Sequence, residues 1–125
     1  MSITVASRKA KGRNLQKWVA QKLAALSGLT YTPGDDESEI DTRPMGQAGV
    51  DIILRGMAAK MFPFAFECKN GESFQLVKSI EQARANSSKE RPWIIVHKRK
   101  KFRNPIVVMD WETFENLLKT NTETT

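Results

Sequence analysis

Two short runs decide the fold of this chain: Gly49-Val50-Asp51-Ile52-Ile53-Leu54-Arg55-Gly56 and, after a brief break, Phe62-Pro63-Phe64-Ala65-Phe66-Glu67-Cys68-Lys69. Both runs are rich in β-branched and aromatic residues and are bounded by glycine or polar residues, a pattern typical of strands. The break between them is short enough for an antiparallel hairpin. With the turn centred near Ala59, Asp51 lies opposite Glu67, and directly opposed side chains have Cβ atoms roughly 4.5–5.5 Å apart.

Strand alternation places the charged side chains of the two runs on one face. Side chains two residues apart share a face, so Glu67 and Lys69 point one way, whereas Cys68 points to the aromatic, core-facing side. Two carboxylates and an ammonium on one face are costly to gather, and we expect them to bind a metal ion. Carboxylate oxygens are the ligands that Mg²⁺ prefers, with Mn²⁺ as a substitute. The predicted ligands are Asp51, Glu67 and the backbone carbonyl of Cys68. A lysine beside such an ion can activate a water or stabilise an attacked phosphate.

These residues resemble a known signature. Asp51 followed by Glu67-Cys68-Lys69 is similar to the PD-(D/E)XK nuclease motif, with Val50 where a proline often stands. The run Lys11-Gly12-Arg13-Asn14-Leu15-Gln16 resembles the Lys-Gly-x-x-x-Glu helix of archaeal- and phage-type Holliday junction resolvases, which carries a glutamate at the metal site where this chain has Gln16. Gln82 matches a polar position used by several relatives. The resemblance implies that Asp51, Glu67 and Lys69 are catalytic, with Gln82 and Gln16 as orienting residues.

The order of predicted elements, helix, strand region, hairpin, helix, strand, strand and helix, indicates an α/β fold. The resemblance implies a restriction-endonuclease-like α/β sandwich, with a central mixed β-sheet flanked by helices. It also implies a Mg²⁺-dependent endonuclease that cleaves DNA at four-way junctions as a homodimer, since two symmetric cuts need two active sites. Three alternatives stay open: another nuclease of this superfamily, of the restriction or repair type; an RNA-directed nuclease; and a non-catalytic DNA-binding module, which Gln16 favours.

Composition agrees with a polyanionic partner. The chain has 125 residues, 20 Lys plus Arg against 14 Asp plus Glu, and a net charge of +6. A positive charge of this size favours association with nucleic acid. We expect one nuclease domain over residues 1–125, with flexible tails at 1–7 and 120–125. The single cysteine and the absence of an apolar run of the ~20 residues needed to cross a bilayer predict a cytoplasmic protein without membrane contact.

Two basic clusters are predicted to contact DNA. Both could instead be solvated surface. The first lies at the start of a helix expected over residues 8–27, where cations oppose the helix dipole unless phosphates compensate them. The second is a loop in which an aromatic ring could stack on a base. The predicted DNA-binding residues are Arg8, Lys9, Lys11, Arg13, Lys98, Arg99, Lys100, Lys101, Phe102 and Arg103.

The remaining segments of the chain give further predictions of secondary structure and of residue roles. We expect short strands near residues 29–32 and 40–45, a helix over 74–86 with Ser73 as N-cap, a parallel strand over 92–97 and another strand over 105–109. Residues 35–41 form an acidic block. It is either a solvated loop or the source of a carboxylate, Glu39 or Asp41, that replaces the one lost at Gln16. His97 is interpreted as structural or phosphate-facing. Asp110 is predicted to cap a last helix that buries Trp111, Phe114, Leu117 and Leu118.

Overall fold

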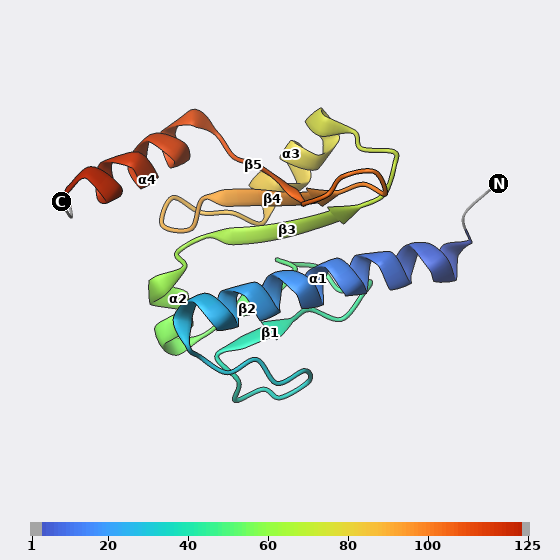
Figure 1. Cartoon of the computed structure of the whole chain (residues 1–125), viewed down its shortest axis with the longest axis horizontal. Helices are drawn as coiled ribbons and strands as arrows, with labels where there is room; N and C mark the ends of the chain where they lie inside the picture. The colour runs from blue at the N-terminus through green and yellow to red at the C-terminus, as the bar shows by residue number, and fades with distance from the viewer. Residues whose placement is uncertain (1–3, 124–125) are drawn as a thin grey trace.

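The computed structural model describes residues 4–123 and is a mixed α/β protein (Figure 1). Its elements are α1 (Val5–Ser27), β1 (Ile40–Thr42), β2 (Ile52–Leu54), α2 (Gly56–Met61), β3 (Ala65–Asn70), α3 (Leu76–Ala85), β4 (Trp93–Lys98), β5 (Ile106–Val108) and α4 (Trp111–Glu123). Residues 5–7 and 120–123, which belong to the predicted tails, are helical. Residues 1–3, 124 and 125 lie outside the described part of the chain.

Five strands form two sheets. In the larger sheet, of order β3-β4-β5, β3 and β4 are parallel with Lys69 opposite His97, and β5 is antiparallel to β4. The smaller sheet pairs β1 and β2 antiparallel, with Asp41 opposite Ile53. The predicted parallel strand after the crossover helix is confirmed, as is a mixed sheet with helices. The strand expected near residues 29–32 is reduced to a single bridge between Tyr31 and Ile40.

The predicted hairpin between the two opening runs is wrong. The break forms the short helix α2, and β2 pairs with β1 rather than with β3. Glu39 stabilises the start of α2, where its carboxylate accepts a hydrogen bond of 2.9 Å from the Met57 N–H. Ala58, fully buried, anchors α2 in the core. One backbone hydrogen bond still joins the two runs, from Asp51 N–H to the Phe66 carbonyl at 3.0 Å.

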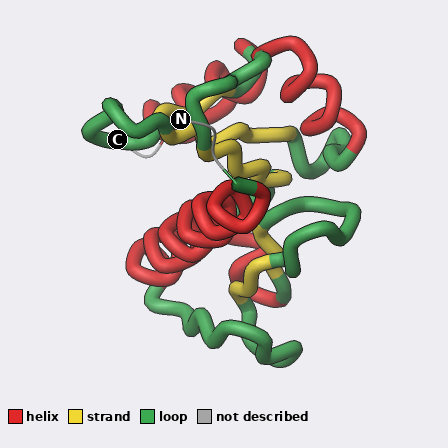
Figure 2. The backbone as a smooth tube through the Cα atoms, turned by 90° about the vertical axis from the view of Figure 1, so that its right-hand side faces the viewer, coloured by secondary structure: helices red, strands yellow, loops and turns green. Residues whose placement is uncertain are grey.

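Helices cover both faces of the larger sheet. Figures 1 and 2 show α1 lying against both sheets. Its buried stripe, which includes Leu15, Val19 and Leu23, follows helical spacing and shares a core with alternate residues of β4, Ile94 and Val96. The other β4 residues pack beneath α3 in a second cluster that contains Ala83, Trp93 and Ile95. Both faces of β4 are therefore buried, which explains its unbroken apolar run.

The ends of the last two helices differ in part from prediction. Helix α3 begins at Leu76 with Gln75 as N-cap, so Ser73 does not cap it. Asp110 does cap α4, since its carboxylate accepts a hydrogen bond of 2.9 Å from the Thr113 N–H. The predicted inner face of α4 is wrong: the large apolar side chains are 40–66% exposed. They are Trp111, Phe114, Leu117 and Leu118.

Candidate active site

Asp51 lies beside Glu67 although no hairpin joins them. The Asp51 N–H bonds to the Phe66 carbonyl, and its Oδ2 accepts a hydrogen bond of 2.6 Å from the Cys68 N–H. These two contacts on either side of Glu67 attach Asp51 to the free edge of β3. The expected juxtaposition of the two carboxylates is therefore produced by a short crossover through α2 instead of a tight turn.

Glu67 is a buried acid next to a second acid. Its residue is only 5% exposed. Burial, followed by the negative charge of Asp51, raises the pKa of Glu67 from 4.5 to about 7. A hydrogen bond of 2.8 Å from Asn86 Nδ2 to Glu67 Oε1 and the charge of Lys69 act in the opposite direction. Near neutral pH the Glu67 carboxyl is therefore poised between its protonated and its ionised form.

Lys69 points to the same side as Glu67, as strand alternation predicts. Its ammonium donates a hydrogen bond of 2.7 Å to Gln82 Oε1. Gln82 lies on α3 and Asn86 follows at its C-cap, four residues later, so both amides project from one side of the helix toward β3. Asn86 was not predicted as a site residue. Its spacing from Gln82 is the sequence signal that could have identified it.

Cys68 contributes backbone atoms rather than its thiol. Its side chain packs against the core under α1, and burial raises its pKa well above the usual value, so it stays protonated. The N–H and C=O of one strand residue point to the same edge of a strand. Because the Cys68 N–H bonds to Asp51, the Cys68 carbonyl lies on the edge that carries the Asp51 carboxylate.

The remaining carboxylates do not complete the site. Glu39 is committed to α2, and the buried Asp41 accepts hydrogen bonds from the Gly34 and Thr42 N–H groups. Both carboxylates are therefore engaged by backbone N–H groups, and the structure gives no support to the alternative that one of them replaces the carboxylate lost at Gln16. Gln16 is buried on α1, and no hydrogen bond found among residues 4–123 joins it to Asp51 or Glu67. Within that range no group of three or more His, Cys, Asp or Glu side chains could hold a metal.

Side chains of the basic loop after β4 contact other parts of the chain. Arg99 pairs with Glu72 at 2.9 Å, and its guanidinium lies 5.8 Å from the centre of the Phe102 ring. Phe102 also packs edge-on against His97, so it is not a free platform for a base. His97 is 2% exposed, stacks on Phe74 at 4.0 Å and has Nε2 3.2 Å from the Gly71 carbonyl. The structural interpretation of His97 is confirmed.

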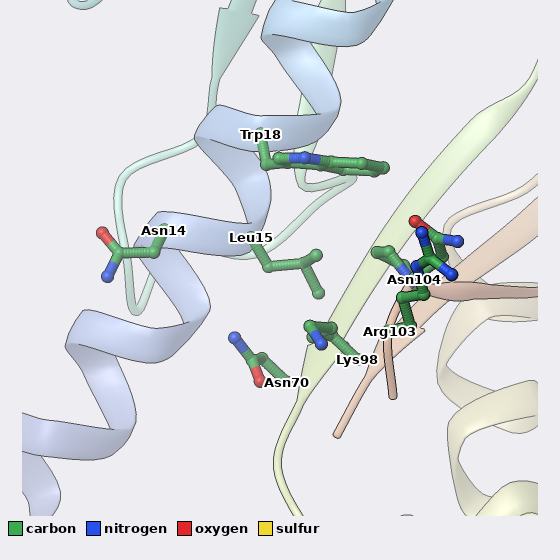
Figure 3. A pocket seen from close by; sticks show the side chains of 8 residues that line it. Asn14, Leu15, Trp18, Asn70, Lys98, Arg103 and Asn104 are labelled. Atoms are coloured by element: carbon green, nitrogen blue, oxygen red, sulfur yellow. The ribbon is translucent and has the colours of Figure 1, made fainter. Parts of the chain in front are cut away.

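Two residues of the second predicted DNA-binding segment, Lys98 and Arg103, border a hollow of about 250 Å³ (Figure 3). The hollow is lined from α1 by Asn14, Leu15 and Trp18, which follow the first basic cluster, and from the ends of β3 and β4 and the later loop by Asn70, Lys98, Arg103, Asn104 and Pro105. A hydrogen bond of 2.9 Å from Asn70 Nδ2 to the Lys11 carbonyl ties the end of β3 to α1. Since Asn70 follows Lys69 on the strand, the hollow lies on the opposite side of β3 from the Lys69 ammonium.

Comparisons of this chain with protein-family models, with curated proteins and with solved structures gave no match. No helix within residues 4–123 has the length and apolar character needed to cross a bilayer. The candidate site is therefore defined by its own geometry: two adjacent carboxylates, a lysine, two amides and a carbonyl-bearing strand edge.

Proposed function

We propose that this protein is a metal-dependent endonuclease that hydrolyses DNA phosphodiester bonds at Asp51, Glu67 and Lys69. The observation that carries the proposal is the placement of a buried acid, Glu67, against a second acid and within the field of a lysine. Such a group costs folding free energy in the absence of a ligand, because like charges are held together in a poorly solvated place. A cation and a phosphate are the ligands that relieve that cost.

The donor set suits Mg²⁺. Asp51, Glu67 and the Cys68 carbonyl would hold the ion, and all three donors are oxygens on the edge of β3 or beside it. Mg²⁺ is commonly bound through one or two carboxylates and keeps several waters, so a third acid is not required. When bound, the ion would lower the pKa of a water and take up charge developing on the phosphate.

The chain's own residues have distinct roles. Lys69 would donate to a non-bridging phosphate oxygen and orient the attacking water, and Gln82 holds its ammonium in position. Asn86 fixes the Glu67 carboxylate through Oε1, which leaves the other oxygen for the ion. Gln82 and Asn86 are thus positioning residues that act through Lys69 and Glu67.

DNA would approach over the basic end of the molecule. Figure 1 shows that β3 points its C-terminal end toward the same end of the molecule as the N-terminal end of α1. There the chain offers the cations of α1 together with Lys98 and Arg103 at the hollow beside Trp18. Phosphate contacts of this kind supply affinity without sequence selectivity.

The PD-(D/E)XK resemblance makes the proposal more specific. The layering of α1, the mixed sheet and α3 is compatible with a restriction-endonuclease-like sandwich. Within that superfamily we favour a Holliday junction resolvase that acts as a homodimer, on the Lys11-Gly12 helix and the small basic chain. A DNA-binding module without catalysis is the second candidate, and Gln16 in place of the family glutamate favours it.

Cleavage of a mobile four-way junction, beside a linear duplex of the same sequence, tests the proposal. We expect paired symmetric nicks with Mg²⁺ or Mn²⁺ and none with EDTA. Glu67→Gln and Lys69→Ala should each lower the rate by about 100-fold or more. Glu81→Gln, an exposed acid on the same helix as Gln82, is the matched control and should cleave normally.

The results of these assays distinguish a resolvase from a less selective nuclease and from a DNA-binding module without catalysis. Cutting of junction and duplex alike would keep the nuclease and reject the resolvase. Tight binding of DNA without cutting under any metal condition, with equal binding by Glu67→Gln, would reject catalysis and leave the DNA-binding module.

A further inference from the structure

The hollow beside Trp18 has an aromatic ring along one side. Trp18 is 39% exposed, and Figure 3 shows its ring edge-on above Asn70 and Lys98, which line the hollow with it. The Lys22 ammonium lies over the ring, 5.3 Å from its centre. Lys22 is one helical turn after Trp18, whereas Asn14, which lines the hollow, is one turn before it. One face of the indole is therefore covered by a cation, and the other is turned to the hollow.

The lining of this hollow favours an anionic ligand with a flat apolar part. Lys98 and Arg103 supply two cations, and no aspartate or glutamate is among the lining residues that the structure describes. Leu15, Trp18 and Pro105 form the apolar part of the lining. A bare metal ion would find neither a carboxylate nor charge compensation here. A nucleotide fits both features, because it joins a planar base to a phosphate.

The hollow has room for one base and is partly organised in advance. Its volume of about 250 Å³ is below the roughly 300–1,000 Å³ of pockets that enclose drug-sized ligands. Asn70 Nδ2 is held by the Lys11 carbonyl at 2.9 Å, and the Lys98 ammonium donates to carbonyls of the loop that follows it. Side chains fixed before binding lose less freedom when a ligand arrives. The amides of Asn14 and Asn104 add donors and acceptors that suit base edges.

We propose that this hollow binds one unpaired DNA base, stacked on Trp18, with the adjoining phosphate at Lys98 and Arg103. The inference rests on the DNA-binding part of the proposed function and does not require cleavage. Asn70 directly follows Lys69 on β3, so a strand with its base in the hollow passes close to the candidate site on the other side of β3. Extracting a base from a regular duplex costs stacking and pairing energy. The preferred substrate is therefore DNA with an unpaired base near the cut.

Binding of a short single-stranded oligothymidylate in EDTA, beside a blunt duplex, tests the proposal without cleavage. Trp18→Ala should bind the single strand about 5- to 100-fold more weakly, the loss typical of one stacked base, and should bind the duplex like the wild type. Trp18→Phe keeps an aromatic face and should recover most of the affinity. Trp111→Ala is the matched control, because Trp111 is 66% exposed on α4 and does not line the hollow. Circular dichroism of each variant checks that the fold is retained.

Fluorescence tests the hollow without altering it. In Trp111→Phe the remaining tryptophans are Trp18 and Trp93, and Trp93 is only 5% exposed. Stacking of a base on the indole should quench the emission of Trp111→Phe as oligothymidylate is added. The quenching should disappear when Trp18→Phe is combined with Trp111→Phe. Thymidine monophosphate, the second probe, should quench only at much higher concentration, because it lacks the phosphate contacts of a strand.

The possible results separate this inference from the nuclease proposal. Equal affinity of Trp18→Ala and the wild type for the single strand, or unquenched emission in Trp111→Phe, would overturn the inference and leave the nuclease standing. Thymidine monophosphate that binds as tightly as the oligonucleotide would overturn the assignment to DNA and indicate a free nucleotide. Binding of the single strand that depends on Trp18, without cleavage of any substrate, would support the base site and reject the nuclease.

Discussion

Two regions of this molecule depart from a stable arrangement in opposite ways. In the first, the carboxylate region, Glu67 is buried against Asp51 at the edge of β3. In the second, helix α4, the aromatic and aliphatic side chains of Trp111, Phe114 and Leu118 face solvent whereas Thr113 is buried. The first departure is relieved by a cation or a phosphate, and the second by an apolar surface. The chemistry of each unfavourable arrangement therefore indicates the class of ligand that would bind there.

The carboxylate region should make stability depend on pH, which is the largest effect we expect. The folded protein holds a proton on Glu67 up to about pH 7, whereas the unfolded chain loses it near 4.5. The folded state binds more protons in this window, so the free energy of unfolding falls as pH rises from 4.5 to 7, by up to about 3 kcal/mol. Urea unfolding at several pH values without metal measures this fall.

Two comparisons show whether Glu67 is its source. Glu67→Gln should flatten the pH dependence, and Glu81→Gln should leave it unchanged. Mg²⁺ should stabilise the wild type more at pH 8 than at pH 5, because the ion binds the ionised pair. An unaltered slope in Glu67→Gln would show that other groups cause the fall.

The sequence predicted the carboxylate region better than the environment of helix α4, for a physical reason. Strand alternation orients Glu67, Cys68 and Lys69 whatever the chain does elsewhere, so their faces were correct even though the hairpin was not. The position of Asp51 needed only proximity to β3, which α2 also provides. The periodicity of α4 was equally clear, but a helical pattern does not state what its apolar face packs against. The hydrogen bonds that Glu39 accepts from Met57 and Asp41 accepts from Gly34 could not be predicted, because they join residues distant in the sequence.

Substitutions of Glu39 test whether this acid has a structural role or belongs to the candidate active site. Its carboxylate holds the first turn of α2, so Glu39→Ala should cost about 1 kcal/mol of unfolding free energy. Glu39→Gln keeps an acceptor and should cost less. Both variants should retain DNA cleavage, whereas replacement of a metal ligand should abolish it. Parallel denaturation and cleavage assays give the answer, and loss of cleavage in Glu39→Gln would return this acid to the metal site.

The smallest effect concerns how α4 is held. Asp110→Ala removes the N-cap, a loss of about 1 kcal/mol, whereas Asp110→Asn keeps a good cap. Because the apolar face of α4 does not pack on its own chain, the loss should appear as faster amide exchange in α4 and not as a lower free energy of global unfolding. A global unfolding free energy that falls by the full amount in Asp110→Ala would mean instead that α4 unfolds together with the core of the chain.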